Sequence, residues 1–376
     1  MVPPKGALMN ADLRGITVPG DHTAVAVGAI GTPYPVSELI EELNEKKWNL
    51  GNGPSISSNT PDVQLNGAAS ANNHCWAVGF FHDTYVSRNL VLAKSGTVWQ
   101  IIPCPNEGDV TVVNGITEVN EVENKLTSIS AVTVKDIWAV GVYGLADDIT
   151  NHPTAFHWDG AAWTSIPIDA PTNSVGDVNS VLNSISMVEH DDGWAVGYGW
   201  DYFLDPLTGT SVGYKRELFE HWNGKKWELV LGSDSHKISR QLNGVSSINK
   251  DDAWAVGATY DSANRIHSLI QHWDGTHWKV DQFSVRDFTL NGVYAVSSDD
   301  VWAVGTCVAG GAGGLTLHWD GVRWRRIPNA YGSIPHCSLN AISGNSSNNI
   351  WAVGSIWGNT IAQLWDGTKW KGYQTE

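Results

Sequence analysis

Two histidines and three aspartates have the types and positions that acid–base chemistry requires. These candidate catalytic residues are His82, Asp83, Asp201, Asp261 and His336. An imidazole titrates near neutral pH, so His82 or His336 could transfer a proton to or from a bound substrate. The three carboxylates would then act as their partners. Either histidine could equally be a loop residue that bonds a neighbouring carbonyl.

A second set of residues mixes aromatic and ionisable side chains, as small-molecule pockets do. Arg240 and Arg286 could hold an anionic group. Trp200, Tyr260 and Trp357 could stack on a ring or stabilise a cation. The candidate ligand-binding residues are Phe81, Tyr143, Trp200, Tyr202, Arg240, Tyr260, Arg286, Cys307 and Trp357. Each could also be an ordinary exposed loop residue, because such side chains are common on surfaces.

The cysteines indicate no cofactor. Cys75, Cys104, Cys307 and Cys337 are too sparse for a disulfide scaffold and lack metal-type spacing. Cys307 and Cys337 fall at the ends of adjacent repeats, where a disulfide, a metal pair with His336 or two unrelated thiols are all compatible with the spacing. Serine-hydrolase, zincin, Walker and dinucleotide motifs do not occur. The sequence therefore predicts no cofactor, assigns no metal ligands and leaves a bound metal ion open.

A repeated four-residue motif indicates the fold that holds these candidate residues. Trp-Ala-Val-Gly or a variant of it occurs seven times, at residues 25–28, 76–79, 138–141, 194–197, 254–257, 302–305 and 351–354. A period of about 50 to 60 residues with strand-like content indicates a β-propeller or a related array.

Each copy supplies four strands, as residues 242–280 illustrate. Asp274-Gly275 predicts a tight hairpin between the last two strands. On the second strand, Trp254 and Val256 alternate with Ala255 and Gly257, so one face is bulky and the other flat. We expect an all-β, seven-bladed β-propeller of four-stranded antiparallel blades, a single domain over residues 1–376. The predicted blades cover about 13–48, 65–99, 126–163, 182–227, 242–278, 290–324 and 339–370.

The spacing within each copy separates a constant rim from a variable one. First-strand Leu to second-strand Trp or Val is 12 residues in six copies and 11 in one, and the closing hairpin always spans 5. The other two connections vary in length and meet at the opposite rim. Function usually resides on variable loops held by a rigid scaffold. If the Leu-Asn-Gly strand lines the channel, the candidate residues gather at the channel mouth.

Four histidines occupy one position of the repeat and therefore read as structural. They are His157, His221, His272 and His318. We expect each to bond toward the Asp-rich turn that precedes the Trp-Ala-Val-Gly strand.

The repeat resembles two propeller families. Its apolar first strand, aromatic second strand and closing Trp are similar to kelch-type blades, and its Trp-centred strands and Trp-X-Gly-X-X-Trp hairpins look like tectonin-type blades. The resemblance covers residues 13–370 and implies architecture alone. The chain has Val-Gly for the Gly-Gly of kelch blades and Trp-Asp-Gly for their Tyr-Asp-Pro.

Charge narrows the choice of partner. The chain has 23 Lys and Arg against 39 Asp and Glu, a net charge of −16. Such a chain repels nucleic acid and anionic membranes, so neither is an expected partner. Residues 1–13 have no signal-peptide pattern, which predicts a cytoplasmic protein or a secreted one whose leader has been removed. The oligomeric state is open.

Three function classes fit these observations. The first, which we favour, is a single pocket at the channel mouth that binds a small organic substrate and transforms it by polar acid–base chemistry, as a nucleotide-independent lyase, cyclase or hydrolase would. The second is a carbohydrate-binding lectin with sites in several blades. The third is a protein-interaction scaffold. The repeated residues read as core and the loop residues differ between blades, which favours one site over several.

Overall fold

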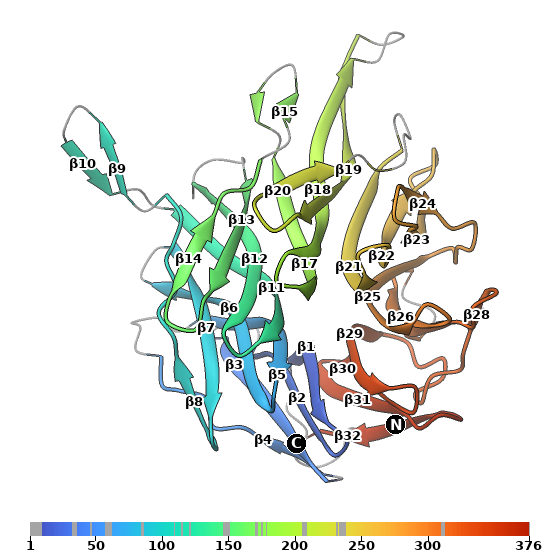
Figure 1. Ribbon diagram of the computed structural model, residues 1–376. Coiled ribbons are helices and arrows are strands. Elements are labelled where there is room, and N and C mark those ends of the chain that lie inside the picture. Colours follow the sequence, from blue (N-terminus) through green and yellow to red (C-terminus); the bar gives the residue numbers. More distant parts are fainter. Residues whose placement is uncertain are drawn as a thin grey trace.

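The fold is a seven-bladed β-propeller. The computed structural model describes residues 10–31, 36–45, 47–56, 62–83, 86–108, 110–113, 116–119, 122–145, 151–169, 172–173, 176–177, 179–204, 209–230, 232, 238–309 and 313–375. Within these ranges every regular element is a strand. Figure 1 shows the blades arranged around the first strand of each, which lies nearest the centre.

Each blade is built from four consecutive strands in up-and-down order, and one bridge between Thr306 and Ser338 joins the sheets of blades six and seven. Blade one contains β1 (Ala11–Gly20), β2 (Thr23–Ile30), β3 (Ser37–Asn44) and β4 (Lys47–Leu50). Blade two contains β5 (Val63–Ala71), β6 (His74–Asp83), β7 (Val86–Ser95) and β8 (Val98–Ile101). Blade three contains β11 (Val122–Thr133), β12 (Asp136–Leu145), β13 (Asn151–Trp158) and β14 (Trp163–Ile166). Blade four contains β17 (Ser180–Glu189), β18 (Asp192–Leu204), β19 (Ser211–Trp222) and β20 (Trp227–Val230).

The other three blades repeat this plan. Blade five contains β21 (Arg240–Asn249), β22 (Asp252–Tyr260), β23 (Ile266–Trp273) and β24 (Trp278–Val280). Blade six contains β25 (Phe288–Ser297), β26 (Asp300–Cys307), β27 (Leu315–Trp319) and β28 (Trp324–Arg326). Blade seven contains β29 (Cys337–Ser346), β30 (Asn349–Ile356), β31 (Asn359–Trp365) and β32 (Trp370–Gln374). Two small hairpins project from the ring, β9 (Val110–Val113) with β10 (Ile116–Val119) and β15 (Thr172–Asn173) with β16 (Gly176–Asp177) (Figure 1).

Bulky and flat faces meet between blades, as the alternation predicts. In blade five, Trp254 and Val256 pack into a cluster with blade six. Ala255 faces the other way, into a cluster with Trp194 of blade four. The predicted hairpin between the last two strands is also confirmed, and it places Trp273 directly opposite Trp278. Each sheet is thus a wedge, and seven wedges close a ring.

A bulge in the first strand explains the repeated glycine. In β21 the register shifts between Leu242 and Gly244, which leaves Asn243 as the extra residue. At this kink the carbonyl of Gln241 presses on the second strand. A Cβ on Gly257 would lie 2.0 Å from that oxygen, and the corresponding distance is 1.9 to 2.1 Å in the other six blades. Only glycine fits at the end of Trp-Ala-Val-Gly.

The bulged residue also joins neighbouring blades. Asn243 Nδ2 donates to the carbonyl of Leu290 in the next blade at 2.8 Å. The equivalent link runs from Asn66 to Leu126, Thr127 to Leu182, Asn183 to Leu242, Asn291 to Leu339 and Asn340 to Leu13, at 2.6 to 2.9 Å. The position in blade one holds Arg14, whose Nε lies 3.4 Å from Asp12. Six side chains therefore connect the seven first strands in series, from blade two through blade seven to blade one.

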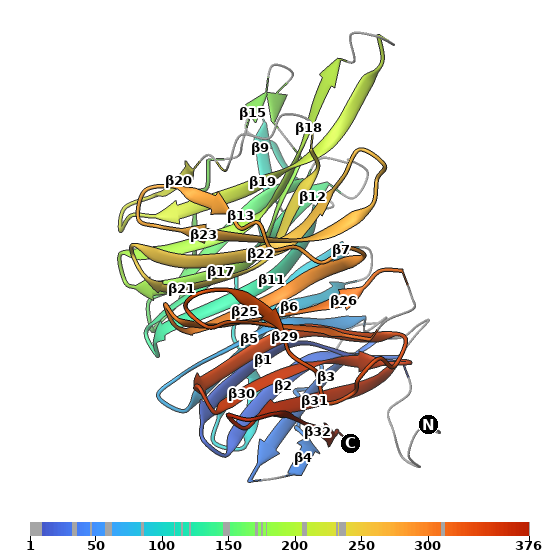
Figure 2. The same cartoon turned by 90° about the vertical axis from the view of Figure 1, so that its right-hand side faces the viewer.

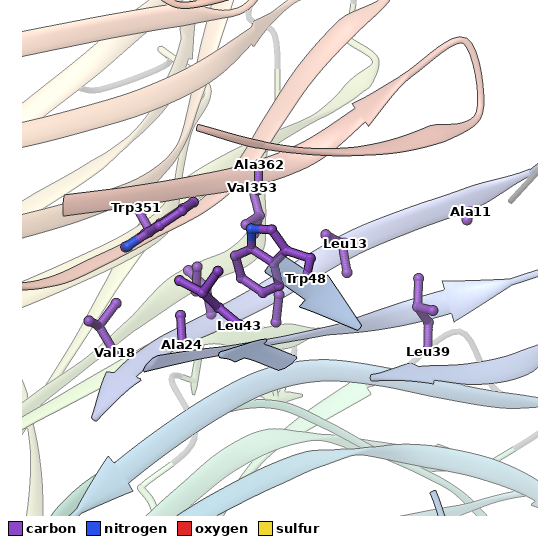
Figure 3. Close-up of a cluster of buried hydrophobic side chains, with 12 residues drawn as sticks. Ala11, Leu13, Val18, Ala24, Leu39, Leu43, Trp48, Trp351, Val353 and Ala362 are labelled. Carbon is purple, nitrogen blue, oxygen red and sulfur yellow. The ribbon is translucent and has the colours of Figure 1, made fainter. Parts of the chain in front are cut away.

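The joint between blades seven and one is packed like the others. Trp351, Val353 and Ala362 of blade seven share one cluster with residues of blade one. Trp48 meets Trp351 edge-to-face at 5.3 Å, and both rings lie between the two sheets in Figure 3. The ring closes through side chains and through a backbone hydrogen bond from the Ala11 amide to the Gly358 carbonyl at 2.8 Å, and each blade supplies all of its own strands.

The repeated histidines are structural, as predicted. His157, His221, His272 and His318 each place Nε2 2.7 to 2.9 Å from an aspartate at the start of the second strand. Each imidazole also lies against the repeat tryptophan of its blade, at 4.2 to 4.6 Å between ring centroids. The Asp–His–Trp contact therefore holds the second and third strands together at the constant rim.

Candidate functional site

The ring axis contains a cavity of about 160 Å³. It is lined by the bulged segments of all seven first strands, including Asn243 and Arg14. The asparagine amide nitrogens in this lining already donate to carbonyl groups of the neighbouring blades. Asn243 Oδ1 also accepts a hydrogen bond from Gln241 at 3.3 Å. Small-molecule pockets usually measure about 300 to 1,000 Å³. None of the fourteen candidate residues lines this cavity, so a site made from them lies elsewhere.

Blade four carries an extended hairpin at the variable rim. Its strands β18 and β19 remain paired out to Leu204 and Ser211, about four residues beyond the end of the equivalent pair in blade five. The candidate residues Trp200, Asp201 and Tyr202 therefore lie within a strand that continues as far as Leu204. Figures 1 and 2 both show this hairpin rising beyond the ring. We call residues 198–204 and 211–217 the arm.

One face of the arm carries three aromatic side chains. Tyr198, Trp200 and Tyr202 occupy alternate positions of β18 and therefore share a face. Tyr202 is 55% exposed and its ring lies over Gly213, where a Cβ would meet Cε1 at 3.0 Å. Tyr198 is half-buried, and burial, reinforced by the neighbouring Tyr260, raises the pKa of its phenol. Solvent exposure of this aromatic strip therefore increases from Tyr198 at the base of the arm to Tyr202 near its tip.

A lysine lies on the same face. Lys215 pairs with Trp200 across the two strands, and its Nζ lies 4.0 Å from the ring centroid of Tyr198 and 5.6 Å from that of Trp200. The ammonium donates to Gln241 Oε1 of blade five at 2.6 Å. Burial lowers the pKa of Lys215. Within the described part of the chain, no carboxylate forms an ion pair with this ammonium.

An ion pair closes the base of the same face. Arg240 Nη1 lies 3.1 Å from Glu217 Oε1, and the two side chains are 13% and 4% exposed. Arg240 begins β21, and Tyr260 ends β22 with its amide bonded to the Ser239 carbonyl. Four predicted ligand-binding residues, Trp200, Tyr202, Arg240 and Tyr260, thus belong to one region between blades four and five. We call Tyr198, Trp200, Tyr202, Lys215, Gln241 and Tyr260 the arm site.

The predicted carboxylates serve other contacts. Asp201 points to the opposite face of the arm, where Oδ2 accepts from Tyr214 Oη at 3.2 Å and lies 3.3 Å from Arg216 Nη1. Asp261 accepts from the backbone amide of Arg265, from the Arg265 guanidinium and from the backbone amide of Ala263, and those bonds hold its pKa far below the ordinary range. Asp83 is exposed at the end of β6.

His82 lies in blade two, away from the arm. Its Nε2 is 3.4 Å from Ser87 Oγ, and the adjacent Phe81 is partly buried in the core between blades one and two. The contact between Phe80 and His82 is edge-on, at 6.0 Å between ring centroids. No bond links this imidazole to a carboxylate within the described residues.

His336 and Trp357 meet in blade seven. Their ring centroids are 4.3 Å apart, and Trp357 is 62% exposed. Both residues have left-handed backbones, with φ of 56° and 53°. Trp357 and Gly358 form the two-residue turn between β30 and β31, a position that usually takes Asn or Gly. The structure brings this pair together but does not join it to the arm site.

The remaining candidates are dispersed. In blade three the ring centroids of Tyr143 and His152 are 5.2 Å apart. In blade six Arg286 Nε lies 3.5 Å from Asp287 Oδ2. All four cysteines are free thiols. Cys337 is buried within the cluster between blades six and seven, whereas Cys307 contacts the cluster between blades five and six.

Sequence reasoning missed three members of the arm site, Tyr198, Lys215 and Gln241. The signal for Tyr198 is present, since aromatics at 198, 200 and 202 have the period of a strand. Lys215 and Gln241 have no comparable signal, because their placement depends on the register of the arm and on contact between blades.

Comparisons with known proteins identify the fold. No family model and no curated protein matches the chain. YCF48 bound to a D1 peptide has a similar structure, with TM-score 0.54 and 13% identity over 98% of this chain and 95% of that one. A polysaccharide lyase of family PL25, an ulvan lyase bound to -[GlcA(1-4)Rha3S]-, gives TM-score 0.53 and 10% identity over 98% and 97%. The fucose-specific lectin from Aleuria aurantia reaches 0.48, with 15% identity over 82% and 93%.

These neighbours have β-propeller architecture in common with this chain, and they bind different ligands. At such identities the likeness shows the fold alone. Among the described residues, no helix is long and apolar enough to cross a membrane.

Proposed function

We propose that this protein binds an acidic saccharide at the arm site. The observation that carries the proposal is the Lys215 ammonium, which lies against two aromatic rings without a carboxylate partner among the described residues. A partly desolvated cation interacts strongly with an anionic group, because the local dielectric constant is lower than in water. The uronate or sulfate of an acidic sugar supplies such a group.

The aromatic strip supports a sugar as the bearer of that charge. An aromatic face that is partly wet, as at Trp200 and Tyr202, can bury the apolar face of a pyranose while its hydroxyl groups stay hydrated. Gln241 offers an amide beside the cation. The proposal retains the single site expected from the sequence and takes its ligand from the carbohydrate alternative.

The test compares oligogalacturonides with their methyl esters by titration calorimetry. Lys215→Gln should weaken binding of the acid by about tenfold or more, equivalent to about 1.4 kcal/mol, and should leave the neutral ester unaffected. Trp200→Ala should weaken the binding of both the acid and the ester. Lys225→Gln, on the opposite rim of blade four, is the matched control and should change neither. Equal affinity of acid and ester, or unchanged binding by Trp200→Ala, would refute the proposal.

Catalysis by His82 or His336 is a separate prediction. A residue that acts as acid or base must exchange a proton with the bound saccharide. Single His82→Ala and His336→Ala variants that retain full turnover of a bound saccharide would exclude both residues as acid or base.

A further inference from the structure

Blade three differs from the other blades at the constant rim. In blades three to six, an aspartate before the repeat tryptophan bonds the hairpin histidine of its own blade. In blades five and six this aspartate also bonds a serine of the next blade, Ser298 for Asp252 and Ser347 for Asp300. In blade three it meets His190, whose Nδ1 lies 3.0 Å from Asp136 Oδ2.

Three metal-ligating side chains therefore converge at one point. Asp136, His157 and His190 place their ligand atoms within 4.8 Å of one another. Two of them are held firmly, since Asp136 also accepts from Trp138 Nε1 at 3.1 Å and His157 lies against the Trp138 ring. The side chain of His190 is 75% exposed, but its backbone is fixed by a 3.1 Å bond from Trp222 Nε1.

We propose that Asp136, His157 and His190 form a binding site for a divalent transition metal of the zinc class. Two imidazoles and one carboxylate are a ligand set that zinc accepts, and water completes a tetrahedral site. Zn–N and Zn–O bonds of about 2.0 to 2.1 Å place tetrahedral ligand atoms roughly 3.3 Å apart. The present contacts, 2.8 Å from His157 Nε2 to Asp136 Oδ1 and 3.0 Å from His190 Nδ1 to Asp136 Oδ2, are close to this spacing, one at each oxygen of the carboxylate. Rotation of the exposed His190 ring can adjust the third distance, from His190 Nδ1 to His157 Nε2.

Binding requires one proton to change position on each imidazole that now donates to Asp136. His157 would ligate through Nε2 with its proton on Nδ1, and His190 would ligate through Nδ1 with its proton on Nε2. The carboxylate is already the acceptor of both contacts. A bound ion would connect blade three to blade four, because His190 is the only one of the three ligands that blade four supplies.

The experiment uses the full chain after chelator treatment and titrates it with Co²⁺ followed by Zn²⁺. We expect one Co²⁺ per chain, displaced by Zn²⁺, with the visible spectrum of nitrogen and oxygen ligands. His190→Ser reproduces the serine of blades five and six, so it should fold normally and weaken Co²⁺ binding by more than about tenfold. His277→Ser, an exposed histidine of blade five, is the control and should bind as the wild type does.

Thermal unfolding provides a second readout. Zn²⁺ should raise the Tm of the wild type and of His277→Ser, because an ion that binds only the folded state stabilises it. It should leave the Tm of His190→Ser unchanged. The proposal is overturned if the wild type fails to bind Co²⁺, if His190→Ser binds it equally well, or if the spectrum shows thiolate charge transfer, which would indicate cysteine ligation.

Discussion

Replacing the buried carboxylate of Glu220 with an amide should stabilise the protein in a pH-dependent way. Glu220 lies in β19 between Ala195 and Leu229 and is fully buried. Neither of its side-chain oxygens has a hydrogen-bond partner among the described residues. Burial, reinforced by the charge of Asp169, raises its pKa from the ordinary 4.5 to about 8. The folded protein therefore holds Glu220 protonated at neutral pH.

The sign follows from which state binds the proton more tightly. Below pH 4.5 both states are protonated and the residue has little effect on stability. Between pH 4.5 and 8 the folded state alone retains the proton, so the free energy of unfolding falls as the pH rises. With these two pKa values, ionisation disfavours folding by about 1 kcal/mol at pH 5 and about 3 kcal/mol at pH 7. Glu220→Gln removes this dependence.

The site already accepts an amide elsewhere in the ring. Gln271 in blade five and Gln363 in blade seven occupy the position of Glu220 and are also fully buried. For 376 residues, an unfolding entropy of about 2.1 cal/mol/K per residue converts 3 kcal/mol into a rise in Tm of about 4 °C at pH 7. The corresponding rise at pH 5 is about 1 °C.

Calorimetry of the wild type and Glu220→Gln at pH 5, 6 and 7 measures this difference. Glu228→Gln, in the neighbouring strand, is the control, because an exposed carboxylate bonded to Lys226 has a lowered pKa. Its removal should give no gain that grows with pH. Glu41 has the same raised pKa of about 8, so some pH dependence should survive in Glu220→Gln. A gain that is equal at pH 5 and pH 7 would show that Glu220 is ionised in the folded protein.

Three further substitutions test the ring itself by equilibrium unfolding. Trp302→Ala removes a side chain that is 1% exposed and should destabilise the fold by about 3 to 5 kcal/mol; a loss below 1 kcal/mol would mean that the neighbouring tryptophans refill the space. Asn340→Ala deletes the 2.8 Å bond to the Leu13 carbonyl and should cost about 1 to 2 kcal/mol, and an unchanged stability would show that this link does not hold blades seven and one. Gly257→Ala places a Cβ 2.0 Å from the Gln241 oxygen and should prevent the native bulge, so a variant of wild-type Tm would contradict the steric explanation.

Much of the fold could be predicted because it is repeated. The Trp-Ala-Val-Gly copies marked the second strands, and the alternation of Trp254 with Ala255 predicted which face meets which neighbour. The histidine contacts followed from their register in the repeat. The role of Asn243 could not be predicted, because its bond crosses to another blade and depends on a bulge that spacing alone does not reveal.

The candidate site could be predicted only in part. Trp200 and Tyr260 belong to one region because each lies six residues after the repeat tryptophan, on the second strands of adjacent blades. Asp201 was grouped with them as a loop residue, yet the strand continues through it and turns its side chain to the other face. His82 and His336 lie in blades two and seven. The spacing within each repeat predicts that both residues lie at the variable rim, but it does not predict how far apart they lie around the ring.

The joint between blades seven and one has a consequence for chain connectivity. It is held by the same kind of side-chain-to-carbonyl link and tryptophan packing as most of the internal joints, and no strand is exchanged across it. The contacts between blades therefore do not require the chain to begin and end at this joint. A circular permutant that joins residue 375 to residue 10 through a linker, and opens between any two blades, should assemble the same seven-bladed ring.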